Sequence, residues 1–123
     1  QKLGSNKLRF FPGVSYRHLL LVKRGAELKL QNLKCLAPHD ISGQSIKKNL
    51  PKGDNADLII KLMLDSKEIL GLHEINQVRL DLKENPANMI WLWGQGVKPS
   101  MPKFVDKFVL SGCVFSSSGM NKL

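Results

Sequence analysis

The sequence predicts an α+β domain, a two-layer sandwich in which a mostly antiparallel or mixed sheet of four to five strands carries two to three helices on one face. Its 123 residues suit one compact domain, and 42% of them are hydrophobic, enough to form a core. Extended segments come first, a pair of helical patterns follows, and shorter extended segments flank a third helical pattern near the end. This order is typical of one sheet covered by helices.

The first forty residues are predicted to be extended. Residues 7–11 and 18–22 are apolar-rich segments separated by a Pro-Gly turn, which predicts two adjacent strands. Residues 28–36 are predicted to form a third short strand that ends before a proline. Residues 38–54 are rich in Pro, Gly, Ser, Asn and Asp, which predicts a long loop. Long ordered loops in compact domains tend to be functional.

Two helices are predicted next, the first capped by Asp54 or Asn55. Its apolar stripe at helical spacing holds Leu58, Ile59, Leu62, Met63, Ile69 and Leu70. Gly71 interrupts the pattern, and a second helix over residues 72–83 ends ahead of Pro86, since the residue before a proline disfavours helix. The apolar side of this second helix consists of Leu72, Ile75, Val78 and Leu82.

The last part of the chain is predicted to hold a strand, a helix and a strand. Residues 89–93 form a strand closed by a Gly-Gln-Gly sequence, and a proline begins the short helix over residues 103–109. Residues 112–115 form the final strand, and residues 116–123 are a linker-like tail. The whole chain, 1–123, is interpreted as one domain. Because it does not begin with Met and ends in a linker, we expect it to be a fragment of a longer protein.

Charge and cysteine content narrow the possible functions. The chain has nineteen Lys and Arg residues and ten Asp and Glu residues, which gives a net charge of +9. No run of consecutive basic residues is longer than two. A nucleic acid, an anionic small molecule or an acidic partner would each suit this charge. Cys35 and Cys113 show no metal-ligand spacing, and we expect two buried, reduced thiols. No apolar run approaches the roughly 20 residues of a membrane span, so a cytoplasmic protein is expected.

Polar residues that could carry chemistry gather at predicted strand ends and on one helix. Those singled out are Arg17, His39, Asp40, His73, Asn76, Arg79, Trp91, Trp93 and Gln95. Each also has a structural explanation: an Asx turn for the His-Asp pair, a solvated helix face for the helical residues, and core packing for the tryptophans. No catalytic triad and no metal-ligand spacing emerges.

Four sequence motifs together resemble the archaeal-type cofactor-independent phosphoglycerate mutase family of the alkaline phosphatase superfamily. They are FPGVSYRH at 11–18, PHDISG at 38–43, the pattern His-x-x-Asn-x-x-Arg at 73–79, and NPANMIWLWGQG at 85–96. They occur in family order across about four-fifths of the chain. Family members pair a phosphatase-like domain, which bears a serine nucleophile and two divalent metals of the Mn or Mg class, with an inserted domain that closes over phosphoglycerate.

The resemblance implies that this chain is the inserted, substrate-capping domain of a glycolytic isomerase that interconverts 2- and 3-phosphoglycerate. Catalytic residues and metal ligands would lie in the missing phosphatase-like domain, so the chain alone is predicted to be inactive and to bind no cofactor. Substrate would lie at the interface of the two domains. The residues that would bind it are Arg17, His39, Asp40, Asn76, Arg79, Trp93 and Gln95.

Within that set, the resemblance assigns each residue type a role. Arg17 and Arg79 would recognise anionic groups, because a planar guanidinium grips phosphate or carboxylate through two hydrogen bonds. His39 and Asp40 would hold substrate hydroxyls or the migrating phosphoryl group. Two alternatives remain open: a relative acting on another phosphorylated substrate, and a stand-alone basic module for an acidic partner or nucleic acid, of which nucleic acid is not favoured.

Overall fold

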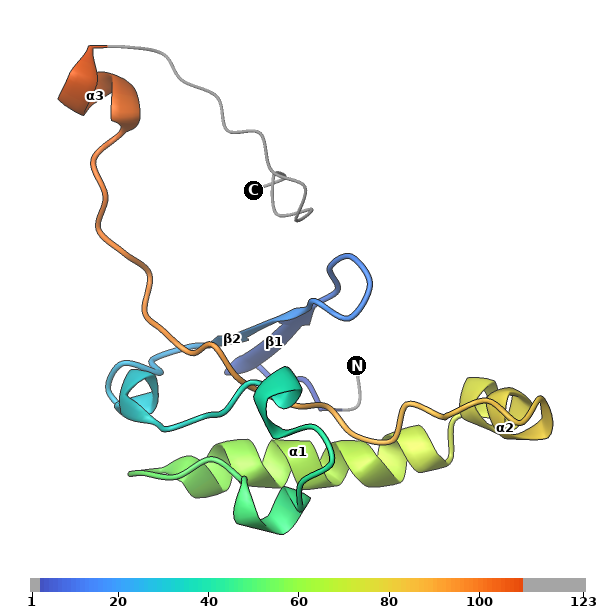
Figure 1. Cartoon of the computed structure of the whole chain (residues 1–123). Coiled ribbons are helices and arrows are strands. Elements are labelled where there is room, and N and C mark those ends of the chain that lie inside the picture. The colour runs from blue at the N-terminus through green and yellow to red at the C-terminus, as the bar shows by residue number, and fades with distance from the viewer. Residues whose placement is uncertain (1–2, 110–123) are drawn as a thin grey trace.

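The computed structural model describes residues 3–109, which form a small α+β structure with a two-stranded sheet and three α-helices (Figure 1). Its elements in chain order are β1 (Leu8–Phe11), β2 (Leu19–Val22), the 3-10 turns η1 (Leu30–Asn32), η2 (Pro38–Ile41) and η3 (Ile46–Lys48), and the helices α1 (Ala56–Gly71), α2 (Glu74–Asp81) and α3 (Phe104–Phe108). The predicted α+β class is confirmed. No helix within residues 3–109 is long and apolar enough to cross a membrane.

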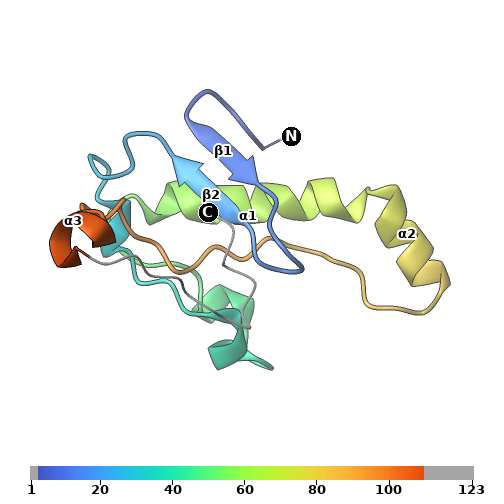
Figure 2. The same ribbon diagram turned by 90° about the horizontal axis from the view of Figure 1, so that it is seen from above.

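The hairpin consists of two short apolar-rich strands, β1 and β2, joined by a loop over residues 12–18 that contains the Pro-Gly pair. The two strands are antiparallel, with Leu8 opposite Val22 and Phe11 opposite Leu19. Every second side chain is half-buried, so one face of the hairpin covers the core and the other faces solvent. Seen from above, the hairpin lies across α1 (Figure 2). Gly13 allows the turn to close, because a Cβ there would lie 2.1 Å from the carbonyl oxygen of Arg17.

The core lies between α1, the hairpin and the segment after η1. Its buried apolar residues are Leu30, Leu33, Ala56, Ile59, Leu62 and Met63. Ala56, Ile59, Leu62 and Met63 lie on α1, and their spacing is that of an amphipathic helix, as predicted. Asn55 does occupy the N-cap position, but with a left-handed backbone (φ 61°), and its side-chain amide donates to the Leu28 carbonyl at 3.1 Å rather than capping the helix. Gly71 ends α1, also as predicted.

Two predicted strands are wrong. Residues 28–36 instead form η1 followed by one isolated bridge between Lys34 and Lys52. Residues 89–93 join no sheet, because their polar groups find partners elsewhere: the Ile90 amide donates to Ser66 Oγ at 2.9 Å and the Trp91 indole to the Leu36 carbonyl at 2.8 Å. Within residues 3–109 the sheet therefore has two strands rather than four to five. The strand predicted at 112–115 and the tail at 116–123 lie outside the described residues.

The remaining helices are shorter than predicted. α2 begins after His73, whose ring nitrogen Nδ1 accepts from the Ile75 amide at 3.3 Å. The apolar side predicted for this helix consists of exposed residues, Leu72, Ile75, Val78 and Leu82. α3 follows an extended arm and stands away from α1 in Figure 1. Residues 38–54 form the predicted long loop, with η2 and η3 inside it.

Candidate functional site

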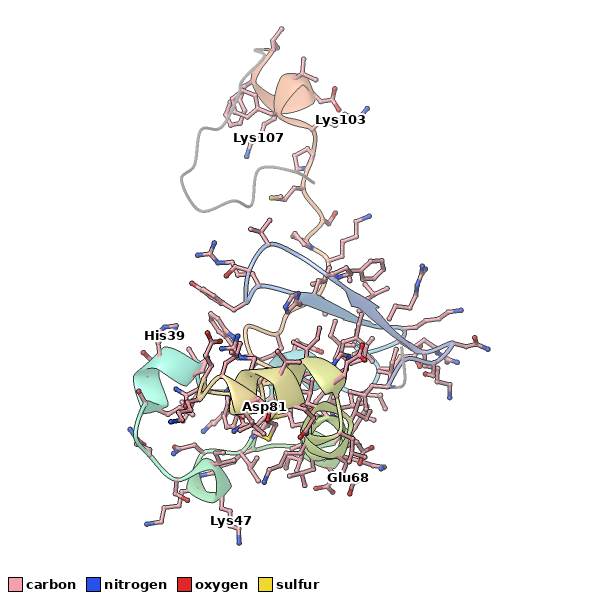
Figure 3. All side chains as sticks on the ribbon, turned by 90° about the vertical axis from the view of Figure 1, so that its right-hand side faces the viewer. His39, Lys47, Glu68, Asp81, Lys103 and Lys107 are labelled. Carbon is pink, nitrogen blue, oxygen red and sulfur yellow. The ribbon has the colours of Figure 1, made fainter. Side chains whose placement is uncertain are left out.

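His39, Asp40 and Trp93 form a contact cluster on η2 and the extended segment after α2. The imidazole of His39 meets the indole of Trp93 edge to face, with ring centroids 5.6 Å apart and planes at 83°. His39 Nε2 lies 3.7 Å from a carboxylate oxygen of Asp40. The two side chains are 70% and 66% exposed, and Figure 3 shows His39 on η2 at the outer edge of the molecule.

Two side-chain hydrogen bonds hold this cluster in place. The Trp91 indole donates to the Leu36 carbonyl at 2.8 Å, and the Gln95 amide donates to the Leu33 carbonyl. Trp93 lies between these two anchors in sequence, and its ring faces the same loop, where it meets His39. Pro38 opens η2 and sets the backbone from which His39 projects.

The cluster is suited to hold a polar ligand. The imidazole offers a donor and an acceptor, the carboxylate accepts, and the indole face supplies apolar contact. An exposed pair at 3.7 Å adds little to stability, so both groups can turn to a ligand at small cost. The cluster therefore has the chemistry of a site for hydroxyl or phosphoryl groups.

Arg17 lies in the turn between β1 and β2. Its guanidinium carbon is 5.2 Å from the centre of the Tyr16 ring, and Nη2 donates to the Tyr16 hydroxyl at 3.3 Å. The Arg17 amide donates to the Val14 carbonyl at 3.1 Å, which closes the turn. Arg17 therefore lies exposed at the tip of the hairpin.

Asn76 and Arg79 on α2 bind backbone groups near the end of α1 and α2. Asn76 is 5% exposed; its amide nitrogen donates to the carbonyls of Leu70 and Ala87, both at 2.6 Å, and its oxygen accepts from the Ala87 amide at 2.9 Å. Arg79 Nε donates to the Asn85 carbonyl at 2.7 Å, and Nη1 lies 3.2 Å from Glu84. These contacts fix the turn after α2.

The structure thus brings together His39, Asp40 and Trp93, with Gln95 as an anchor. Figures 1 and 2 show α2, which carries Asn76 and Arg79, beyond the end of α1 and away from η2. A site that also includes Arg17, Asn76 and Arg79 stays a prediction. Among the described residues, no group of three His, Cys, Asp or Glu side chains could hold a metal ion.

Sequence reasoning missed the buried residue Ser66. It is 0% exposed on α1, donates to the Met63 carbonyl at 2.6 Å and accepts from the Ile90 amide. It therefore joins α1 to the segment that leads to Trp93. Its position one turn after Met63 within the apolar stripe was the available signal, because a serine on a buried face needs a hydrogen-bond partner.

Cys35, half-buried beside the core, gives a first testable prediction. Burial raises the pKa of its thiol above the usual 9.0, so at pH 8 it holds less of the reactive thiolate. We expect iodoacetamide to alkylate Cys35 more slowly in the folded chain than in the urea-unfolded chain, as measured by mass spectrometry of its peptide. Since the unfolded thiol loses its proton first, the free energy of unfolding should fall above about pH 9. Equal alkylation rates in both states would contradict this.

Comparisons with known proteins identify the family to which the chain belongs. The family model described as 2,3-bisphosphoglycerate-independent phosphoglycerate mutase matches residues 1–76. A Geobacter sulfurreducens protein named "Probable 2,3-bisphosphoglycerate-independent phosphoglycerate mutase" is 44% identical over 115 residues, which cover 94% of this chain and 28% of the relative. Proteins of Methanothrix thermoacetophila and Methanosarcina mazei, both named 2,3-bisphosphoglycerate-independent phosphoglycerate mutase, are 41% and 39% identical over 93% and 98% of this chain.

The family model and these relatives define one class of protein, the phosphoglycerate mutases. The chain belongs to the 2,3-bisphosphoglycerate-independent phosphoglycerate mutase family, as the resemblance predicted. It spans 28–30% of the length of these three relatives. No solved structure matches it.

Proposed function

We propose that this chain is the substrate-binding, capping part of an enzyme that interconverts 2- and 3-phosphoglycerate in the cytoplasm. The observation that carries the proposal is the exposed cluster of His39, Asp40 and Trp93, in a chain whose relatives are named as mutases. The proposed ligand is phosphoglycerate, held where this chain meets a phosphatase-like domain outside it.

Charge supports an anionic substrate. Residues 3–53 hold ten Lys and Arg against two acidic residues, a surplus of eight. The hairpin, η1, η2 and η3 all belong to this basic half. A field of one sign attracts an oppositely charged substrate and raises its local concentration. Phosphoglycerate, which carries a phosphate and a carboxylate, is the type of molecule that this half would attract.

In the proposed site, His39 and Asp40 hold the substrate hydroxyl or the phosphoryl group during transfer, and Trp93 packs against the carbon chain. Gln95 holds the segment in position through Leu33. Arg17, at the hairpin tip, would recognise an anionic group. Arg79 would do the same through the N–H donors that do not bind the Asn85 carbonyl or Glu84. Asn76 would support Arg79 by fixing its turn.

The chemistry of transfer is assigned to the part of the enzyme outside this chain. Two divalent metals of the Mn or Mg class would stabilise charge on the phosphoryl group there. The described residues do not offer a donor set for such an ion. In this proposal the chain binds and covers substrate, and the part of the enzyme outside it carries out the transfer.

A graft tests this function. The matched segment of the Methanosarcina mazei relative is replaced by this chain, and conversion of 3-phosphoglycerate to 2-phosphoglycerate is measured with Mn²⁺. We expect the chimera to keep activity within about tenfold of its parent, because a tenfold loss is only about 1.4 kcal/mol of transition-state stabilisation. A chimera with the parent's melting temperature but no mutase activity would contradict the proposal, and turnover of another phosphorylated substrate would favour the related-enzyme alternative.

The chain on its own gives the matching control. With Mn²⁺ or Mg²⁺ present, the 123-residue chain should show no mutase activity above background. Turnover by the chain alone would overturn the proposed division between binding and chemistry. A steep fall in nucleic-acid binding with salt, together with an inactive chimera, would instead favour the basic-module alternative.

A further inference from the structure

The loop between β1 and β2, residues 12–18, is held by contacts between its own two arms. The Gly13 amide donates to Nδ1 of the His18 imidazole at 3.1 Å. The backbone also approaches closely at this point, because a Cβ on Gly13 would overlap the Arg17 carbonyl. Gly13 is therefore in direct contact with the far arm of the loop, which curves away from α1 in Figure 1.

A tight turn lies inside this closed loop. The Arg17 amide donates to the Val14 carbonyl at 3.1 Å, and Ser15 between them has a left-handed backbone with φ of 58°. A residue other than glycine keeps such a conformation where the surrounding contacts enforce it. The hydrogen bond between Gly13 and His18 joins the two residues that flank this turn, so it is placed to enforce the turn.

The turn also sets the position of the Arg17 side chain. Its guanidinium carbon lies 5.2 Å from the centre of the Tyr16 ring, and Nη2 donates to the Tyr16 hydroxyl at 3.3 Å. Both residues belong to the turn, so their contact depends on the backbone that the loop adopts. An arginine that is already ordered loses less conformational entropy when it binds an anion. The closed loop therefore prepares Arg17 for binding.

We propose that His18 is a positioning residue, whose Nδ1 holds the loop in the conformation that places the Arg17 guanidinium against Tyr16. An imidazole nitrogen accepts a hydrogen bond only when it carries no proton, so the proton of the neutral ring lies on Nε2. His18 acts through Arg17, so this role rests on the proposed function of Arg17 in recognising the anionic substrate. Gly13 and His18, two residues of the motif at 11–18, then serve one purpose.

The loop itself is tested by NMR on the 123-residue chain. The Gly13 amide hydrogen should exchange at least about fivefold more slowly in the parent than in His18→Leu, which keeps the bulk but removes the acceptor. His18→Asn is the matched control, because its Oδ1 can accept in place of Nδ1, and it should keep the slow exchange. Nuclear Overhauser contacts between the Arg17 guanidinium and the Tyr16 ring should weaken only in His18→Leu. Equal Gly13 exchange in all three chains would overturn the proposal.

The action of His18 through Arg17 is tested by the kinetics of the active chimera with 3-phosphoglycerate. His18→Leu should raise KM about threefold to tenfold and change kcat less than about twofold, the pattern of weakened substrate binding. His18→Asn should leave KM within about twofold. In an Arg17→Gln chimera, adding His18→Leu should change KM by less than about twofold, because the residue through which His18 acts is already gone.

Two kinetic results would overturn the proposal. One is an unchanged KM in a His18→Leu chimera that has the parent's melting temperature. The other is an equal rise in KM with and without Arg17, since His18 would then support the hairpin rather than position Arg17. A parent chimera without mutase activity would instead contradict the proposed function, and the exchange rate of the Gly13 amide would then decide the role of His18 by itself.

Discussion

Replacing Asn76 by alanine is expected to lower the free energy of unfolding by about 2–4 kcal/mol. The Asn76 side chain is 5% exposed and makes three hydrogen bonds, to the Leu70 carbonyl and to both backbone groups of Ala87. Alanine would remove the partner of the amide and of the carbonyl of Ala87, and one of the two donors to the Leu70 carbonyl, which still accepts from the His73 amide at 3.1 Å. Urea denaturation of the 123-residue chain, read by circular dichroism, measures the change.

The neighbouring Gln77→Ala variant is the control. Gln77 is exposed and its amide donates to the Gly71 carbonyl at 3.0 Å, so its loss should cost no more than about 0.5 kcal/mol. A second variant, Asn76→Asp, keeps the shape but turns a carboxylate oxygen toward two carbonyls, and it should be at least as destabilising as alanine at pH 7. If both Asn76 variants were as stable as Gln77→Ala, the hydrogen bonds by which Asn76 joins Leu70 of α1 to Ala87 would not stabilise the fold.

Replacing Met63 by alanine is expected to cost about 2–5 kcal/mol, the usual range for emptying a core position. Met63 is 0% exposed and belongs to the cluster that joins α1 to Leu30 and Leu33. Because this core is small, little surrounding structure is available to collapse into the cavity. The same urea experiment measures the loss.

Leu64→Ala is the matched control for Met63→Ala, since Leu64 is the next residue of α1 and is 46% exposed. Its substitution should cost about 1 kcal/mol or less, because half of the side chain already contacts water. Similar losses in the two variants would mean that the core does not lie on the predicted stripe of α1.

The elements that could be predicted from the sequence are those specified by neighbouring residues. The hairpin needs only two apolar-rich segments and the Pro-Gly turn between them, so the prediction of 18–22 differs from β2, Leu19–Val22, by a single residue. The apolar spacing of α1 and its stop at Gly71 are equally local. In each case the signal lies within one element, and the structure confirms it.

The segment at 89–93 shows why the rest could not be predicted. A segment with apolar residues on both faces is typical of a central strand and equally of an extended segment packed on a helix. Its hydrogen-bond partners, Ser66 and Leu36, are 24 and 55 residues away in sequence. The contact between His39 and Trp93 is similarly distant in sequence; motif order suggested a shared site, but only the fold shows that the two rings touch.

The roles of the α2 residues were also hidden from the sequence. The His-x-x-Asn-x-x-Arg pattern suggested ligands for a substrate, whereas in the structure these three side chains bind nearby backbone groups. A polar side chain that forms a hydrogen bond with a buried backbone group cannot be distinguished by sequence from one that binds a ligand. Substrate binding by Asn76 and Arg79 therefore stays a prediction.

The central claim is that the His39 cluster handles phosphoglycerate, and the kinetics of His39→Asn in the active chimera test it most directly. We expect kcat/KM to fall about ten- to a hundredfold, the scale of a lost hydrogen bond to a charged group. The control is His73→Asn, which removes an imidazole but keeps a capping side chain at the start of α2. It should leave kcat/KM within about twofold. A folded His39→Asn chimera with the same kcat/KM as its His73→Asn counterpart would contradict the claim.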